Sequence, residues 1–261
     1  MKLHPALLAL LLFGGSAAAH DQWLETEPAA PLTGKPFKLY LQVGEHLSSA
    51  EPAQLKSRDR YSRFAAITAK GRRDLLATLR EDTQPIAAVP MEKASMIIAL
   101  DSTTRQIELD AEKFAAYLLE ERLVSVLAQR VERNEEDVPG REKYSRSMKT
   151  FVFGADEELF VKAVGQDLEV VPLTSPRKAT GTLTVQVLFK GKPLPRAALT
   201  IANRLNSVVK AQHVRSDANG KAEFVFARTG DWFIGLVHME RSTEPDADWR
   251  SYWSSLTFHL D

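Results

Sequence analysis

The sequence has 261 residues, of which 44% are hydrophobic and 26% are charged, with 34 basic and 34 acidic side chains. This is the composition of an ordinary globular protein, and the zero formal charge excludes a nucleic-acid-binding protein that works by bulk neutralisation of phosphates. The absence of cysteine excludes disulfide frameworks, thiolate catalysis, cysteine-based zinc sites and iron–sulfur clusters. Any metal must therefore be held by His, Asp, Glu, Met, backbone groups or the chain terminus.

The first nineteen residues are typical of a secretory signal peptide. Lys2 gives a positive start, an apolar run covers residues 6–13, and Ala17 and Ala19 fit an A-x-A cleavage site. The apolar run is much shorter than the ~20 residues that a membrane-spanning helix needs. We therefore expect cleavage after Ala19 and a periplasmic or secreted protein that does not span the membrane once it is processed.

Cleavage after Ala19 would make His20 the N-terminal residue of the mature protein. A terminal α-amine and an imidazole in general have pKa values of about 8 and about 6.5, so an N-terminal histidine can offer both nitrogens to one metal ion near neutral pH. The alternative is that the cleavage site leaves a histidine at this position by chance. The sequence therefore makes His20 a candidate metal ligand.

Residues 20–175 are expected to form a β-rich domain with one long helix. Alternating apolar residues predict a strand at 37–43, and 61–68, 96–100 and 106–109 are further strand candidates. Asp110 is a good N-cap for a helix over 111–133, in which apolar residues recur every three or four positions. The basic segment 141–149 is expected to form a solvated face or a salt-bridge patch, with anion binding as the alternative.

A domain boundary is expected near Ser175 and Pro176, because the pattern after it is plainly β. About seven strands at regular spacing are typical of an immunoglobulin-like or transthyretin-like β-sandwich, here over residues 176–261. The strand candidates lie at 182–189, 197–202, 208–214, 222–226, 232–238 and 252–260. The side chains that we expect to point inward are Leu183, Val185, Val187, Phe224, Phe226 and Ile234.

The sequence carries no signature of a common enzyme class, and we expect no enzyme: the nucleophile elbow, the Walker loop, the dinucleotide fingerprint and the HExxH motif are all missing. His238 and His46 each come at the end of an apolar strand, where binding sites are commonly built. The alternative for His238 is a histidine packed against an aromatic core. His213 and His259 lie within alternating strands and are expected to be surface or packing residues.

The segment 246–253 is dense in aromatic and charged residues. We expect Trp249 and Trp253 to close the end of the sandwich and Asp248 to cap the turn. The alternative is that the segment forms a recognition rim for a partner.

Several motifs along the chain carry a family resemblance. They are residues 20–24, 191–194, 217–220, 230–234, 237–239 and 248–258, together with Arg141, Glu142, Tyr144 and Arg146. This pattern resembles a bacterial periplasmic family of unknown-function domains, commonly labelled as the periplasmic component of cobalt or nickel uptake. The resemblance implies a secreted β-rich protein with a divalent-metal role for His20 and for the histidine before Met239. Arg250 departs from it, because an acidic residue is expected there.

We therefore expect a periplasmic protein that binds a divalent metal ion, nickel or cobalt, with His20, His238 and His46 as candidate ligands. Its expected partners are the metal ion and an inner-membrane transport complex. A copper-binding histidine brace is the nearest variant, because nitrogen ligands bind Cu²⁺ more tightly still. The alternative from another class is a metal-free β-sandwich interaction module that binds a partner protein or a surface polymer. A copper oxygenase has the least support, because the possible histidine brace is the only feature of the sequence that favours it.

Overall fold

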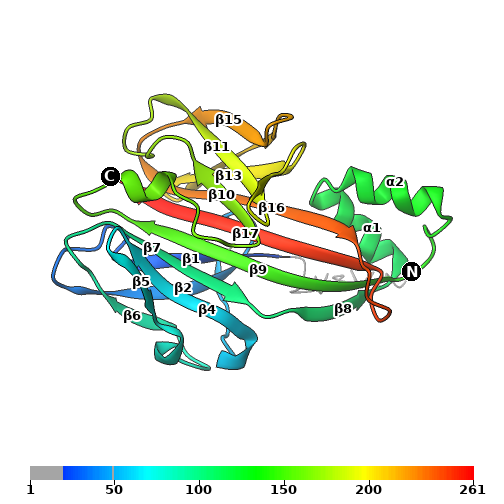
Figure 1. The fold of residues 1–261 in the computed structure, drawn as a ribbon, viewed down its shortest axis with the longest axis horizontal. Coiled ribbons are helices and arrows are strands. Elements are labelled where there is room, and N and C mark those ends of the chain that lie inside the picture. The colour runs from blue at the N-terminus through cyan, green and yellow to red at the C-terminus, as the bar shows by residue number, and fades with distance from the viewer. Residues whose placement is uncertain (1–19, 49) are drawn as a thin grey trace, which may run out of the picture.

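The computed structural model describes residues 20–48 and 50–261, and the predicted signal peptide, residues 1–19, lies outside them. The expected mainly β fold is confirmed, because the strands of this part of the chain form three sheets (Figure 1). The strands are β1 (Asp21–Glu27), β2 (Pro36–Gly44), β3 (Glu51–Pro52), β4 (Tyr61–Thr68), β5 (Gly71–Asp74), β6 (Ala87–Pro90), β7 (Met96–Ser102), β8 (Arg105–Leu109), β9 (Gly140–Val152), β10 (Leu168–Pro172), β11 (Gly181–Phe189), β12 (Lys192–Pro193), β13 (Ala198–Leu205), β14 (Val208–Arg215), β15 (Lys221–Phe226), β16 (Gly230–Arg241) and β17 (Trp249–Leu260).

The largest sheet has the order β14-β13-β16-β17-β9-β7-β4-β5, and β8 also pairs with β9. We call it the central sheet. β17 and β9 run parallel, whereas the other neighbours in this sheet are antiparallel. Strands from before and after residue 175 therefore share one sheet, and β10, which precedes this position, pairs with β11, which follows it.

Both faces of the central sheet are covered (Figure 1). On one face, the sheet of β10, β11, β12 and β15 closes a sandwich core, and the six side chains predicted to point inward are all buried in it, which confirms their strand phase. On the other face, β1, β2, β3 and β6 cover one part and the two helices cover another. Successive residues of a strand point to opposite faces, so each central strand contributes alternate side chains to two different cores.

The expectation of one long helix over 111–133 is wrong, because the chain forms two helices, α1 (Ala111–Glu120) and α2 (Val124–Glu132). The Asp110 carboxylate accepts a hydrogen bond from the backbone N–H of Lys113 at 2.8 Å, as an N-cap does. α1 ends where Arg122 takes a positive φ of 57° and the N–H of Leu123 bonds to the carbonyl of Leu118. No helix of the described residues is long and apolar enough to cross a membrane. Short 3₁₀ turns lie at Arg58–Arg60, Leu76–Thr78 and Glu158–Val161.

The basic segment 141–149 is part of β9, in the middle of the central sheet, rather than a solvated face. The expected salt-bridge patch is confirmed: Arg141 pairs with Asp248 at 2.8 Å, and Lys149 pairs with Glu169 at 2.6 Å where both side chains are only 1% exposed. The Asp248 carboxylate thus binds β9 rather than capping its own turn. Charged residues can occupy this central strand because other segments bring them opposite charges.

Candidate functional site

In the structure, His46 lies at the start of β1. This strand begins at Asp21, the residue that follows His20. Asp21 of β1 pairs in register with Gly44 of β2, and the Asp21 Oδ2 lies 2.5 Å from the Nδ1 of His46. His20 is half-buried and stands one position before this pair. The β1–β2 pairing therefore brings His20 and His46 to the same end of these two strands, where the contact that His46 forms is with Asp21.

The turn that carries His46 has an unusual backbone. His46 and Leu47 have positive φ values of 45° and 68°, a region that residues other than glycine, asparagine and aspartate seldom occupy. Leu47 is buried in a cluster with Trp23 and Phe233, and the ring of His46 lies 5.9 Å from that of Phe233. This packing holds the turn in a conformation that costs free energy, which is characteristic of functional sites.

The contact with Asp21 affects the pKa of His46 and determines which of its ring nitrogens is left to bind a ligand. Burial alone would lower the pKa of His46, but its hydrogen bond to Asp21 and the charges of Asp21 and Glu45 more than offset this and raise the pKa. A carboxylate on Nδ1 orients the imidazole and leaves Nε2 as the nitrogen that can bind a ligand. The pair therefore has the form of a histidine with an orienting carboxylate.

Other charged groups converge on Asp21 from α1 and β9. Burial and then the charge of Asp21 raise the pKa of Glu121, at the end of α1, well above its usual value. Arg146 of β9 is 5% exposed, its guanidinium lies 4.3 Å from the ring of Trp253, and it also feels the charge of Asp21. Asp21, Glu121 and Arg146 thus come together at the partly buried start of β1.

His238 lies on the opposite face of the central sheet. The pairing of β16 with β17 is continuous from Gly230 to Arg241, so Phe233 and His238, five positions apart, point to opposite faces. The His238 ring packs 4.4 Å from that of Phe189, which in turn packs on Tyr252 in the sandwich. Burial lowers the pKa of His238, and the structure does not bring it to His20 or His46.

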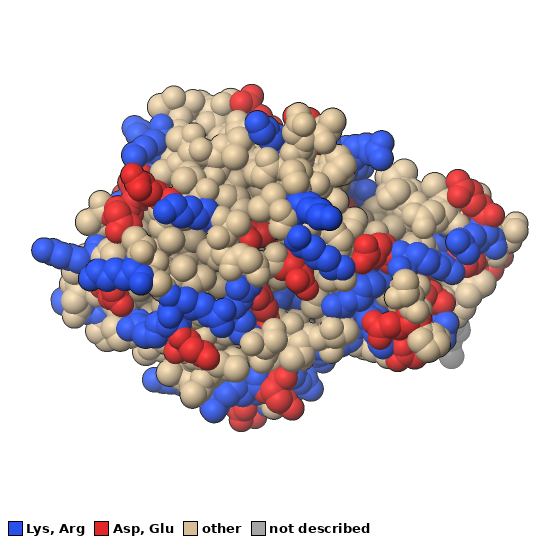
Figure 2. Space-filling view, in the orientation of Figure 1, with Lys and Arg blue, Asp and Glu red and all other residues tan. Residues whose placement is uncertain are grey.

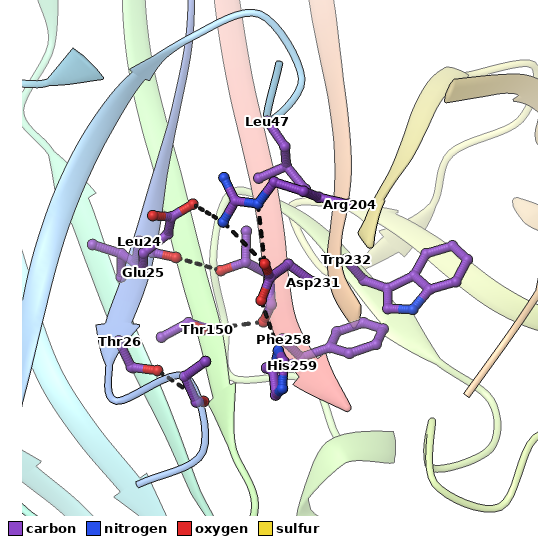
Figure 3. A pocket seen from close by; sticks show the side chains of 12 residues that line it. Leu24, Glu25, Thr26, Leu47, Thr150, Arg204, Asp231, Trp232, Phe258 and His259 are labelled. Atoms are coloured by element: carbon purple, nitrogen blue, oxygen red, sulfur yellow. Dashed lines mark hydrogen bonds and ion pairs between the residues drawn. The ribbon is translucent and has the colours of Figure 1, made fainter. Parts of the chain in front are cut away.

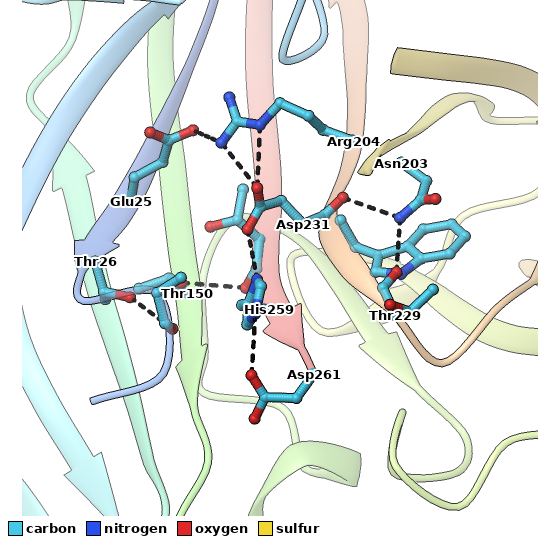
Figure 4. A network of polar contacts seen from close by, with 12 residues as sticks. Glu25, Thr26, Thr150, Asn203, Arg204, Thr229, Asp231, His259 and Asp261 are labelled. Carbon is cyan, nitrogen blue, oxygen red and sulfur yellow. Dashed lines mark hydrogen bonds and ion pairs between the residues drawn. The ribbon is translucent and has the colours of Figure 1, made fainter. Parts of the chain in front are cut away.

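His213 and His259 are both occupied in packing and polar contacts. His213 Nε2 lies 2.7 Å from Arg122 Nη2, a contact in which the neutral imidazole accepts the hydrogen bond. His259 Nδ1 lies 2.7 Å from the carboxylate of Asp231 (Figure 4). The prediction that these two histidines are surface or packing residues is confirmed.

A polar network anchors β1 at a distance from the His46 site. Arg204 bridges Glu25 of β1 and Asp231 of β16, each at 3.0 Å (Figures 3 and 4). A cavity of about 100 Å³ lies beside this network. The hydroxyls of Ser255 and Thr257 also donate to carbonyls of β1, at 2.8 Å and 2.6 Å. These contacts fix the position of β1 on the central sheet, and so the position of Asp21.

Trp249 and Trp253 are buried in the core under the two helices, so they neither close the end of the sandwich, as expected, nor form an exposed recognition rim. Asp21 and Glu121 were not predicted from the sequence as members of the site. Asp21 could have been predicted, because it directly follows His20, the expected N-terminal residue. Glu121 could not be found in the same way, because only the packing of α1 brings it to β1.

Within residues 20–48 and 50–261, no three side chains of His, Asp or Glu are gathered so that they alone could hold a metal ion. No curated protein matches the chain. Residues 17–240 match the family described as a domain of unknown function, DUF4198, and because the match covers most of the sequence, the chain belongs to this family.

Proposed function

We propose that the chain is a periplasmic protein that binds a divalent metal ion, nickel or cobalt, at its mature N-terminus, with His20 and His46 as ligands. The observation that carries the proposal is the 2.5 Å contact between Asp21 and Nδ1 of His46, directly after His20. Histidines that ligate metals commonly have a carboxylate on the other ring nitrogen, which fixes the ring and makes it a better ligand.

The donor set fits a late first-row metal ion. An N-terminal His20 offers an amine and an imidazole, and His46 offers Nε2, so two residues provide three nitrogen ligands. A site of this kind needs no cluster of three side chains. Nitrogen ligands bind the ions of this series with an affinity that rises through cobalt and nickel to copper. Selectivity for nickel or cobalt would therefore depend on geometry and on the metals available, and a copper-binding brace is the nearest variant.

The surroundings of the site favour a cation. Asp21 and Glu121 lie close enough for the charge of one to raise the pKa of the other. A bound divalent cation would relieve this repulsion and favour the ionised form of both carboxylates. The soluble protein would then hand the ion to an inner-membrane transport complex, as the family resemblance implies.

The proposal is tested with protein that is exported, cleaved and purified without a tag, because a tag would convert the N-terminal amine into an amide. Intact mass must first place the N-terminus at His20. Titration calorimetry with Ni²⁺, Co²⁺ and Cu²⁺ then compares the wild type with His46→Asn. Asparagine tolerates the positive φ of residue 46, so this variant removes the imidazole while keeping the turn.

We expect His46→Asn, or one extra residue before His20, to weaken binding by about 100-fold or more, and Asp21→Asn by about 10–100-fold. His238→Asn is the matched control and should leave the affinity unchanged, because His238 lies on the opposite face of the central sheet. Equal affinity in the wild type, His46→Asn and the extended protein would reject the site. The interaction-module alternative would then stand.

A further inference from the structure

A second polar site lies away from His46, in a groove of about 500 Å³ that crosses the central sheet from Arg250 of β17 to Arg72 of β5. The groove passes over β9, β7 and β4, and Figure 2 shows Lys and Arg side chains gathered on this part of the surface. Its lining combines four arginines with hydroxyl groups and only two aspartates. Those charged residues are Arg63, Arg72, Arg146, Arg250, Asp101 and Asp167.

Arg250 has more hydrogen-bond donors than its surroundings use. Its Nη2 donates to the hydroxyls of Thr104 and Ser145, each at 3.1 Å, and its guanidinium lies 4.7 Å from the ring of Tyr252. Its Nη1 is buried without a hydrogen-bond partner, and no described carboxylate forms an ion pair with it. A buried donor without a partner costs free energy, so its presence calls for an acceptor that the chain does not provide.

The two hydroxyls beside Arg250 add further donors. Thr104 and Ser145 each accept a hydrogen bond from Arg250, so each keeps its own proton for another partner. Within the described part of the chain neither hydroxyl donates that proton to an acceptor. A guanidinium whose Nη1 lacks an acceptor, together with two hydroxyls whose protons lack acceptors, forms a site for an oxyanion, because an oxyanion presents several acceptor oxygens at once.

The charge of the groove favours the same ligand. Arg63 is bound to Asp101 and to the carbonyls of Val164 and Gly165, so the charge of Asp101 is already balanced. Arg72 is exposed and has no polar partner among the described residues. The excess of positive charge in a concave site raises the local concentration of anions.

We propose that the groove binds a small oxyanion, whose carboxylate or phosphate group contacts Arg250, Thr104 and Ser145. The volume of about 500 Å³ is within the usual range for small-molecule sites. The groove shares Arg146 with the surroundings of Asp21, but the proposed ligand contacts are those of Arg250, Thr104 and Ser145, so the proposal does not require a metal ion at His20 and His46.

The experiment uses metal-free, full-length mature protein and calorimetric titration with citrate, pyrophosphate and acetate. Citrate and pyrophosphate present the two oxyanion chemistries separately, and acetate has a single charge. We expect binding of citrate or pyrophosphate that weakens as salt is added, with acetate weaker than both. Arg250→Gln should reduce the affinity by at least about tenfold, as the loss of a charge-assisted hydrogen bond predicts.

Two further variants keep the test decisive if Arg250→Gln alters the fold. Thr104→Val removes an exposed hydroxyl at nearly constant volume and should also weaken binding. Arg133→Gln removes one exposed positive charge on the helical side of the molecule and should change nothing. The proposal is overturned if the wild type binds neither citrate nor pyrophosphate, or if Arg250→Gln and Thr104→Val bind them as the wild type does.

Discussion

His46 and His238 stand in similar sequence contexts and in opposite environments. In the sequence each follows an apolar run and has a glutamate within two positions. In the structure, His46 contacts the Asp21 carboxylate at 2.5 Å, and its pKa is raised. His238 packs against Phe189 in the sandwich, and burial lowers its pKa.

The difference arises from residues that lie far from each histidine in the sequence. Asp21 reaches His46 because β1 pairs with β2, and Phe189 reaches His238 because the sheet of β10 and β11 covers that face. A strand sends alternate residues to opposite faces, so the identity of the covering layer decides whether a histidine meets a carboxylate or an aromatic ring. One face therefore carries the proposed metal ligand, and the other carries a half-buried histidine that packs on Phe189.

The largest expected effect is a loss of stability when the buried ion pair of Lys149 and Glu169 is broken. This pair lies on the same face of the central sheet as His238. Burial lowers the pKa of Lys149, and Glu169 also accepts hydrogen bonds from the backbone of residues 164–166. Lys149→Met leaves a buried carboxylate without its cation, which should lower the free energy of unfolding by about 3–5 kcal/mol. Urea denaturation of the metal-free protein measures this loss.

Lys143→Met is the matched control for Lys149→Met, because both lysines lie on β9. Lys143 pairs with Glu244 and Asp246 at the surface, at 2.5 Å and 2.7 Å, where water can replace the lost partner. We expect a much smaller loss of stability than for Lys149→Met. Equal losses in the two variants would contradict the burial of the Lys149–Glu169 pair.

A second pair of variants tests whether only one face of the central sheet supports metal binding. Phe233 is fully buried beneath His46 and lies 5.8 Å from Trp23, so Phe233→Ala should cost about 3–5 kcal/mol of stability and loosen the turn of His46. Phe224→Ala removes a buried ring from the other core and should cost a similar amount. Only Phe233→Ala should also weaken Ni²⁺ binding in calorimetry. Equal metal affinity in the two variants would show that the turn of His46 is not part of the proposed metal site.

Much of the fold could be predicted from the sequence, because most strands carry their own alternation. The predicted strand at 61–68 matches β4, and the one at 208–214 ends one residue before β14 does. β9 was missed, because its charges hide the pattern and their partners, such as Glu169 and Asp248, lie far along the chain. The break between α1 and α2 was missed because the apolar repeat continues across Arg122. Only the histidines of the site were predicted from the sequence. The residues that contact them depend on which strands pair, and the sequence pattern does not show this.

The smallest expected effect is the pH dependence of the two histidines in the metal-free protein. Because folding raises the pKa of His46, its protonated form with Asp21 stabilises the fold below the unfolded pKa of ~6.5, and this stability is lost as the pH rises through the folded value. His238 has the opposite sign: its folded pKa is lowered, so the fold loses stability as the pH falls from ~6.5 toward that value.

Proton titration of the imidazole signals by NMR measures both values in one sample. We expect His46 to titrate above and His238 below the ordinary value of ~6.5. Asp21→Asn removes the charge that offsets burial, so it should move the His46 midpoint downward and leave His238 unchanged. A His46 midpoint that does not respond to Asp21→Asn would show that the carboxylate does not control this ring. The two histidines would then differ in burial alone, and the orienting contact would no longer support the metal site.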